Sequence, residues 1–163
     1  MNFRLINHQV MDDTYRMCNE NIDLIKSIKY TNNNSYVIYE NDNINVDSIT
    51  ATTDIIVSNK RSLEAAKSYV GKKITVLDFA NNHHVGGSPW SASAQEESMC
   101  RCSTLYSCLE YHYNDYYDKH IDEYQNSIID NFGSDDLIYL PKIKIFKTDE
   151  ITPALLEKSG WYD

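Results

Sequence analysis

The chain has 163 residues, 42% hydrophobic and 24% charged, which suits one globular domain with a buried core. No stretch approaches the roughly 18 uninterrupted apolar residues of a membrane span, and the N-terminus lacks the apolar region of a signal peptide, so we expect a cytoplasmic protein. The net charge of −9 argues against direct binding of nucleic acid, because capture of a phosphate backbone relies on a basic surface. A polyanionic ligand would have to be held locally, by backbone N–H groups.

The N-terminal part of the chain predicts two helices and a strand. Apolar residues recur at helical spacing from residue 11 to about residue 30, and we expect a break between two helices at residues 19–21. Residues 30–34 are rich in asparagine and predict a turn. The β-branched and aromatic run at residues 36–39 predicts a short strand.

The middle of the chain predicts strands on both sides of a short helix. Residues 53–57 predict a strand, and residues 62–67 predict a helix with Ser62 as its N-cap and Gly71 beyond its end. Residues 74–79 form a nearly continuous apolar run, which is typical of a buried parallel strand.

The remaining elements complete an alternating order of strands and helices. A helix is expected to begin near Gln95, and helical or mixed structure to continue over residues 111–130. Residues 137–140 and 143–146 predict two further strands with Pro141 between them. This order predicts an α/β sandwich.

The loop after the 74–79 strand is the expected ligand site. The strand ends at Asn81, the pair Gly86-Gly87 follows, and Glu96 and Glu97 stand where a helix should begin. Ligands of open α/β sheets bind beyond the carboxyl ends of the strands, so a pocket is expected here. The two glycines let a phosphate or a ribose approach the main chain closely.

The spacing of these motifs resembles that of the poly(ADP-ribose) glycohydrolases. That family carries Gly-Gly-Gly followed by Gln-Glu-Glu, and here six residues separate Gly86-Gly87-Ser88 from Gln95-Glu96-Glu97. The flanking segments at residues 60–67, 100–106 and 139–147 also look like the microbial-type branch of the family. The resemblance covers essentially the whole chain.

The resemblance implies a macrodomain-like α/β/α sandwich with a helical N-terminal extension. Residues 1–163 would form a single domain, in which residues 1–52 are the extension with a short strand and residues 53–163 are the N-terminal portion of the catalytic domain. Family members continue into another core strand and a second glycine-rich loop that cradles the diphosphate. We therefore expect the C-terminal portion of the domain to be missing, leaving an open sheet edge and exposed apolar surface.

The resemblance also implies the roles of the site residues. Glu97 would be the catalytic group, Glu96 would position the ribose, and Asn81 would contact the sugar of the terminal ADP-ribose. The other substrate-binding residues would be Gly86, Gly87, Ser88 and Gln95. No metal and no organic cofactor are expected, and the expected ligand is ADP-ribose or poly(ADP-ribose) on modified macromolecules.

The chemistry suits a pair of neighbouring glutamates. Cleavage of a ribose–ribose bond needs an acid to protonate the leaving hydroxyl and then a base to activate water, and one carboxylate can serve both steps. Adjacent residues on a helix point about 100° apart, so Glu96 and Glu97 should divide positioning and chemistry between them. Burial, or the like charge of Glu96, would favour the protonated form that Glu97 needs as an acid.

The expected function is therefore a glycohydrolase that releases ADP-ribose from poly(ADP-ribose). Two alternatives stay open. One is a non-catalytic ADP-ribose-binding module, favoured because Ser88 replaces the third glycine, because Pro89 stiffens the loop, and because the second glycine-rich loop is missing. The other is a hydrolase of mono-ADP-ribosylated protein or nucleic acid.

Several residues in and near the site also have simpler interpretations. Without the resemblance, Gln95-Glu96-Glu97 would be a charged first turn that offsets a helix dipole. His83 and His84 do not have the spacing of a metal site with Cys100 and Cys102, and these cysteines, like Cys18 and Cys108, are expected to be free thiols. Cys108 and His112 could form a thiol–imidazole dyad, although a buried thiol beside a surface histidine is the commoner arrangement. The tyrosines between residues 106 and 124 are expected to pack in the core or on the surface, and one could stack on adenine.

Overall fold

The computed structural model describes residues 2–44, 52–126 and 135–163, so the end of the expected N-terminal extension and residues 127–130 of the expected helical stretch lie outside the described residues. Its α-helices are α1 (Phe3–Glu20), α2 (Ile22–Asn34), α3 (Ser62–Lys67), α4 (Gln95–Cys102), α5 (Leu105–Tyr111) and α6 (Asp118–Asn126). A π-helical turn, η1 (Tyr113–Tyr117), joins α5 to α6, and a 3-10 turn, η2 (Lys158–Gly160), lies near the C-terminus. None of the helices in the described ranges is both long and apolar enough to cross a membrane.

Two short strands form the sheet of the described residues. Strand β1 (Tyr36–Ile38) pairs antiparallel with β2 (Leu137–Tyr139), and Val37 lies opposite Ile138. Both strands fall where the sequence predicts them. The pair brings together segments about a hundred residues apart in the sequence, and its half-buried Val37 and Ile138 pack against the hydrophobic core.

The break between the first two helices is confirmed at Asn21. The Asn21 side chain accepts hydrogen bonds from the N–H groups of Asp23 and Leu24 at 3.0 and 3.4 Å, which caps α2. The predicted turn at residues 30–34 is wrong, because α2 continues to Asn34. Thr31 accounts for this difference: it is buried, and its hydroxyl donates to the carbonyl of Pro141 at 2.9 Å. Tertiary contact therefore outweighs the weak helix propensity of the asparagine-rich segment.

Helix α3 occupies the predicted residues, but its cap differs from the prediction. Arg61, not Ser62, is the N-cap residue, and it makes no side-chain cap bond. The carboxylate of Asp149 instead accepts hydrogen bonds from the Leu63 N–H at 3.1 Å and from the Arg61 Nε–H at 2.8 Å. A carboxylate at this end of a helix satisfies free N–H groups and offsets the helix dipole.

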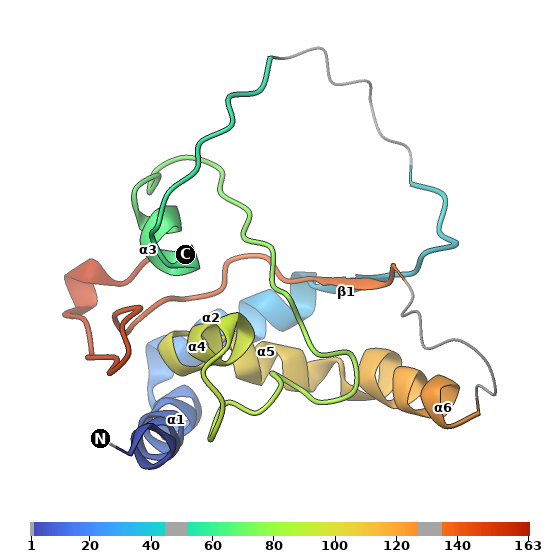
Figure 1. Cartoon of the computed structure of the whole chain (residues 1–163), viewed down its shortest axis with the longest axis horizontal. Coiled ribbons are helices and arrows are strands. Elements are labelled where there is room, and N and C mark those ends of the chain that lie inside the picture. The colour runs from blue at the N-terminus through green and yellow to red at the C-terminus, as the bar shows by residue number, and fades with distance from the viewer. Residues whose placement is uncertain (1, 45–51, 127–134) are drawn as a thin grey trace.

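The predictions of strands at residues 53–57 and 74–79 are wrong in this structure. Both segments are extended, yet neither pairs with another strand among the residues described. In Figure 1 the chain before and after α3 is drawn as a tube without strand arrows. Their apolar side chains are exposed, with Ile55 at 89% and Phe79 at 75% of full exposure. A strand becomes part of a sheet only when a neighbour takes its backbone hydrogen bonds, and these two segments lack that neighbour.

The predicted strand at residues 143–146 is also reduced to isolated bridges. Ile145 pairs with Ser103 on one side and with Tyr162 on the other, and its N–H donates to the Tyr162 carbonyl at 2.7 Å. These bridges hold the C-terminal segment against the end of α4.

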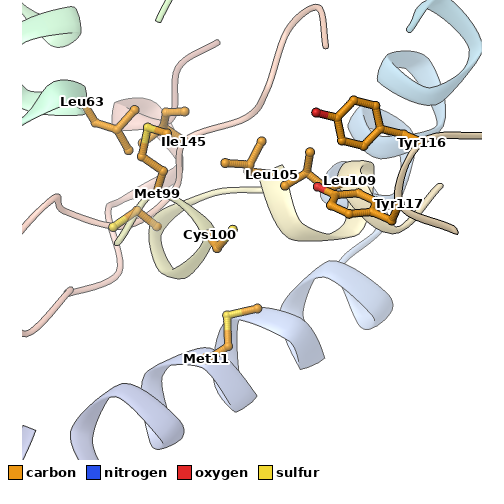
Figure 2. Close-up of a cluster of buried hydrophobic side chains, with 10 residues drawn as sticks. Met11, Leu63, Met99, Cys100, Leu105, Leu109, Tyr116, Tyr117 and Ile145 are labelled. Carbon is orange, nitrogen blue, oxygen red and sulfur yellow. The ribbon is translucent and has the colours of Figure 1, made fainter. Parts of the chain in front are cut away.

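The hydrophobic core lies between the helices (Figure 2). Met11 of α1 lies below Cys100 of α4, and the cluster continues through Leu109 of α5 to Tyr116 and Tyr117 of η1 (Figure 2). All of these side chains are buried, and burial of apolar surface stabilises a fold by roughly 25 cal/mol per Å². All four cysteines are free, as predicted, and all four are buried. The core fixes the position of α4, the helix that carries the predicted site.

Helix α1 packs directly on the site helix. It contacts α2, α4 and α5, and the hydroxyl of Thr14 donates to the carbonyl of Arg101 at 2.8 Å. The buried ammonium group of Lys147 donates to Thr14 and Asp13, both at 2.8 Å, and ties α1 to the C-terminal segment.

Candidate active site

Glu96 and Glu97 lie in the first turn of α4 and are both buried, at 3% and 8% of full exposure. The N-cap residue Ala94 makes no side-chain cap bond, and the two carboxylates are the acidic groups of the first turn, at the positive end of the helix dipole. A charged turn that only offset the dipole would remain in solvent. The burial of both glutamates therefore tells against that interpretation.

The loop before α4 donates backbone hydrogen bonds to both carboxylates. The Asn81 N–H donates to Glu96 Oε2 at 2.9 Å, and the Ser88 N–H donates to Glu97 Oε1 at 3.2 Å. The second oxygen of each group, Oε1 of Glu96 and Oε2 of Glu97, is buried and has no hydrogen-bond partner among the described residues. Each glutamate thus has one oxygen that fixes its orientation and one that is free to interact with a ligand or a proton.

Gly86 and Gly87 bring the loop against these side chains. Both have left-handed backbone angles, with φ of +63° and +66°. A Cβ atom on Gly87 would lie 2.5 Å from Glu97 Oε1 and 3.1 Å from Glu96 Oε2, and one on Gly86 would lie 2.9 Å from the Cys100 sulfur. The main chain therefore approaches the carboxylates closely at Gly87 and Cys100 at Gly86, and the approach of a ligand to these glycines stays a prediction.

Two buried polar side chains that the sequence analysis did not single out hold the rest of the loop. Arg101 donates from Nη1 to the carbonyls of Pro89 and Ala92, both at 2.7 Å. Asn7 of α1 donates from Nδ2 to the same Ala92 carbonyl at 3.0 Å. The position of Arg101, one helical turn after Glu97, is a signal that could have identified it. The sequence carries no such signal for Asn7.

The predicted substrate-binding residues Asn81 and Gln95 shape the loop through their side chains. The Gln95 amide donates to the Leu77 carbonyl at 2.7 Å and accepts from the Phe79 N–H at 2.9 Å, which ties the extended segment to α4. The Asn81 side-chain oxygen accepts from the N–H groups of His83 and His84 at 2.9 and 2.8 Å. The structure brings both residues to the glutamates, and their contacts with a substrate stay predictions.

Asp78 is a third carboxyl group beside the two glutamates. Leu77 and Phe79 are exposed, whereas Asp78 between them is half-buried and lies close enough to Glu96 and Glu97 for the charges to interact. Both of its carboxylate oxygens are buried and have no hydrogen-bond partner in the part of the chain that the structure describes. A single acid within the apolar run 74–79 is the signal that could have identified it.

Burial and like charge change the proton affinity of this cluster. Burial, reinforced by the charges of Asp78 and Glu97 and opposed by the Asn81 hydrogen bond, raises the pKa of Glu96 to about 8. Burial, together with the charge of Glu97, raises the pKa of Asp78 to about 6. Near neutral pH the site therefore holds at least one proton on its carboxyl groups.

A pocket of about 530 Å³ borders the loop. Gly87, Ser88 and Trp90 line it together with two aromatic side chains, those of Tyr106 and Tyr113. The Trp90 indole N–H donates to Asp12 Oδ1 at 2.7 Å, which orients the ring. Gly87 thus borders both the pocket and the carboxylates, and two of the tyrosines between residues 106 and 124 line the pocket.

The two alternative sites of the sequence analysis do not form. In the described residues, no group of three or more His, Cys, Asp or Glu side chains is arranged to hold a metal ion. His112 does not pair with Cys108, because its Nε2 lies 2.7 Å from the Ser35 hydroxyl and its Nδ1 lies 3.0 Å from Asp115 Oδ2. Burial raises the pKa of Cys108 to about 12, so the thiol stays protonated.

Comparison with known proteins relates this geometry to a family. Residues 7–148 match the family described as microbial-type PARG, catalytic domain. The poly(ADP-ribose) glycohydrolase of Thermomonospora curvata superposes with a TM-score of 0.78 at 23% identity, covering 96% of this chain and 60% of that one. The same enzyme bound to the inhibitor ADP-HPD gives a TM-score of 0.73 at 22% identity, covering 96% and 59%. A comparison with curated proteins found no match.

The likeness confirms the macrodomain-like fold expected from the sequence, over a chain that spans about 60% of the length of these solved structures. The family match covers most of the described residues and includes the loop, the three carboxyl groups and all of α4. The chain therefore belongs to the microbial-type poly(ADP-ribose) glycohydrolase catalytic-domain family.

Proposed function

We propose that this chain supplies the catalytic carboxylates of a glycohydrolase that cleaves ribose–ribose O-glycosidic bonds of poly(ADP-ribose) and releases ADP-ribose. One observation carries the proposal. Two adjacent buried glutamates each have one oxygen held by a loop N–H group and one buried oxygen without a partner. The family to which the chain belongs acts on this class of polymer, which supports the choice of substrate.

In this proposal Glu97 acts first as an acid and then as a base. Its Oε1 is held by the Ser88 N–H, which leaves Oε2 to protonate the leaving ribose oxygen as the glycosidic bond breaks. The resulting carboxylate then takes a proton from the water that attacks the sugar carbon, which restores the acid. A single group completes the cycle without net gain or loss of protons.

The neighbouring residues would position the sugar. Glu96 would bind a ribose hydroxyl through its free oxygen, and Asn81 would contact the terminal sugar. Gly86, Gly87 and Ser88 would lie beside the ribose and the diphosphate, where main-chain N–H groups suit an anionic ligand in a chain of net charge −9. Gln95 would act indirectly, through its hydrogen bonds to residues 77 and 79.

We also propose that the protein acts in the cytoplasm. Its four cysteines are free, buried thiols, an arrangement suited to a reducing compartment.

A binding module without turnover is the second candidate. Residues 74–79, which carry Asp78 and lead into the loop, have no strand beside them in the described residues, and Leu77 and Phe79 are exposed. Acid–base catalysis on a glycosidic bond benefits from a site closed to bulk water. An open site favours binding of ADP-ribose without hydrolysis.

Labelled poly(ADP-ribose) distinguishes these functions. We expect the wild-type protein to release ADP-ribose, Glu97→Gln to bind the polymer without releasing it, and Glu64→Gln, a change on α3, to act as the wild type does. Binding without release by both wild type and Glu97→Gln would support the binding module. Release from a mono-ADP-ribosylated protein or nucleic acid but not from the polymer would support a mono-ADP-ribosyl hydrolase. Equal release by wild type and Glu97→Gln would overturn the assignment of Glu97.

A further inference from the structure

We propose that the pocket beside the glycine-rich loop binds an arginine side chain of the protein that carries the ADP-ribose. The residues that line this pocket of about 530 Å³ include Gly87, Trp90, Tyr106 and Tyr113. The mechanism above does not use it. The inference goes beyond the proposed function, because it concerns the recognition of a target protein and needs no turnover. Only the identity of that partner rests on the proposed function.

Three aromatic rings give the pocket its character. The rings of Trp90 and Tyr106 stand nearly perpendicular, with centroids 5.1 Å apart and an angle of 89° between their planes. Tyr15 of α1 packs against both, at centroid distances of 6.2 Å and 5.8 Å, and fixes their orientation. Tyr113 is 46% exposed, so its ring can adjust to a ligand. The faces of such rings are negative and attract a cation within about 6 Å of the ring centre.

Acidic side chains interact with two of these rings. Asp12 Oδ1 accepts a hydrogen bond from the Trp90 indole N–H at 2.7 Å, and a negative charge at that edge makes the ring face more negative. Asp12 Oδ2 lies 2.9 Å from His8 Nδ1 in an exposed pair. Burial, reinforced by the charge of Glu110, raises the pKa of Tyr106 to about 12, so this hydroxyl stays neutral. Both acids therefore make the pocket more attractive to a cation.

The protein does not fill the pocket with a cation of its own. Of the described residues that line it, none is a lysine or an arginine. Two histidines, His83 and His84, do line it, and the His83 ring packs against that of Tyr124 at a centroid distance of 4.7 Å. Arg16 of α1 is held in exposed ion pairs, and Arg101 of α4 donates to loop carbonyls. A cationic ligand would therefore not compete with these two arginines.

The charge balance favours an arginine over the nucleotide of the polymer. An adenine ring would also stack on these side chains, but in the polymer it is joined to a diphosphate. Neither the two acids nor the net charge of −9 favours further negative charge there. An arginine side chain is planar, weakly hydrated and stacks on aromatic faces, and Ser88 and Ser91 of the same pocket carry hydroxyls that can accept its hydrogen bonds. Because Gly87 borders both the pocket and Glu97, the bound arginine would lie beside the catalytic loop.

A proton–nitrogen NMR titration with N-acetyl-arginine amide tests the proposal without turnover, and N-acetyl-citrulline amide is the uncharged control of nearly the same shape. We expect the arginine compound alone to shift the Trp90 indole N–H signal in a saturable way. The indole N–H of Trp161 donates to the Leu156 carbonyl at 3.1 Å and does not line the pocket, so it serves as an internal control.

Two tyrosine variants, each checked for a native amide spectrum, complete the test. Tyr113→Ala should weaken the binding of the arginine compound about two- to fivefold, the scale of one exposed cation–π contact. Tyr111→Ala removes an exposed tyrosine that does not line this pocket and should leave the binding unchanged.

Absence of a saturable Trp90 shift would overturn the proposal, and so would equal shifts with the arginine and citrulline compounds. Unchanged affinity in Tyr113→Ala, or tighter binding of ADP than of the arginine compound at Trp90, would overturn it as well. None of these measurements depends on hydrolysis. A protein that binds the arginine compound but releases no ADP-ribose would contradict the glycohydrolase alone, so the two failures are distinguishable.

Discussion

Gly87 offers a sharp test of how the loop meets the carboxylates. In Gly87→Ala the new methyl group would lie 2.5 Å from Glu97 Oε1 and 3.1 Å from Glu96 Oε2, well inside normal contact. The substitution also places a Cβ on a residue with φ of +66°. We expect lower stability and displaced glutamates, and hence a loss of ADP-ribose release.

Gly71 is the matched control for this substitution. It also has a left-handed angle, with φ of +89°, but a Cβ there would meet no atom within 4 Å. The left-handed angle alone should cost roughly 1–2 kcal/mol at both positions. The contact with the carboxylates should add about 1–3 kcal/mol at Gly87, the usual range for overpacking in a buried site.

Urea unfolding followed by circular dichroism measures both variants, with binding of labelled polymer measured in parallel. The expected order of stability is wild type, then Gly71→Ala, then Gly87→Ala, and only Gly87→Ala should change polymer binding or release. Equal losses of stability in the two variants, with polymer binding intact in both, would refute the packing of Gly87 on the carboxylates.

Other features of the chain give three further predictions. Arg101→Lys should lower the free energy of unfolding in urea by about 1–3 kcal/mol, because a lysine cannot reproduce the hydrogen bonds to the Pro89 and Ala92 carbonyls. Arg16→Lys, at a residue whose ion pairs are exposed, should change it little, and equal effects of the two substitutions would contradict the role of Arg101. The raised pKa values of Asp78 and Glu96 mean that the folded state binds more protons than the unfolded state, so the free energy of unfolding should fall as pH rises from about 4 to about 8. Thermal unfolding of the wild type and of Asp78→Asn over this range measures the effect. A wild-type midpoint that rises relative to that of Asp78→Asn would contradict this prediction. The exposed side chains of Ile55 and Phe79 should make the protein associate as its concentration rises, as measured by sedimentation velocity. The double variant Ile55→Lys, Phe79→Lys should associate less. A wild-type protein that stays monomeric at all concentrations would count against this prediction.

The sequence was most informative where local pattern and chemistry agree. Helical periodicity interrupted at residues 19–21 predicted the break that the structure places at Asn21, and a charged triplet after a glycine pair predicted the start of α4 near Gln95. The six-residue spacing between the glycine turn and the triplet also predicted that Glu96 and Glu97 lie beside a loop. A helix N-terminus and a glycine turn are both local features, which a sequence pattern can identify.

The sequence was least informative where structure depends on distant partners. The apolar run at residues 74–79 has the composition of a buried strand, but a sheet requires a neighbouring strand that no local pattern supplies. The helical state of Thr31 depends on the Pro141 carbonyl, and the cap of α3 depends on Asp149. The burial of Asp78 likewise required the chain to fold back on α4, although the acid stood out within its apolar surroundings.

Single-turnover release of ADP-ribose from labelled polymer tests the central claim most directly, with wild type, Glu97→Gln and Glu96→Gln compared at saturating protein. General acid–base catalysis typically contributes about 10²–10⁴-fold, so Glu97→Gln should lose about that factor while retaining polymer binding. Glu96→Gln should weaken binding more than Glu97→Gln does. Release by Glu97→Gln at the wild-type rate would contradict Glu97 as the catalytic carboxylate.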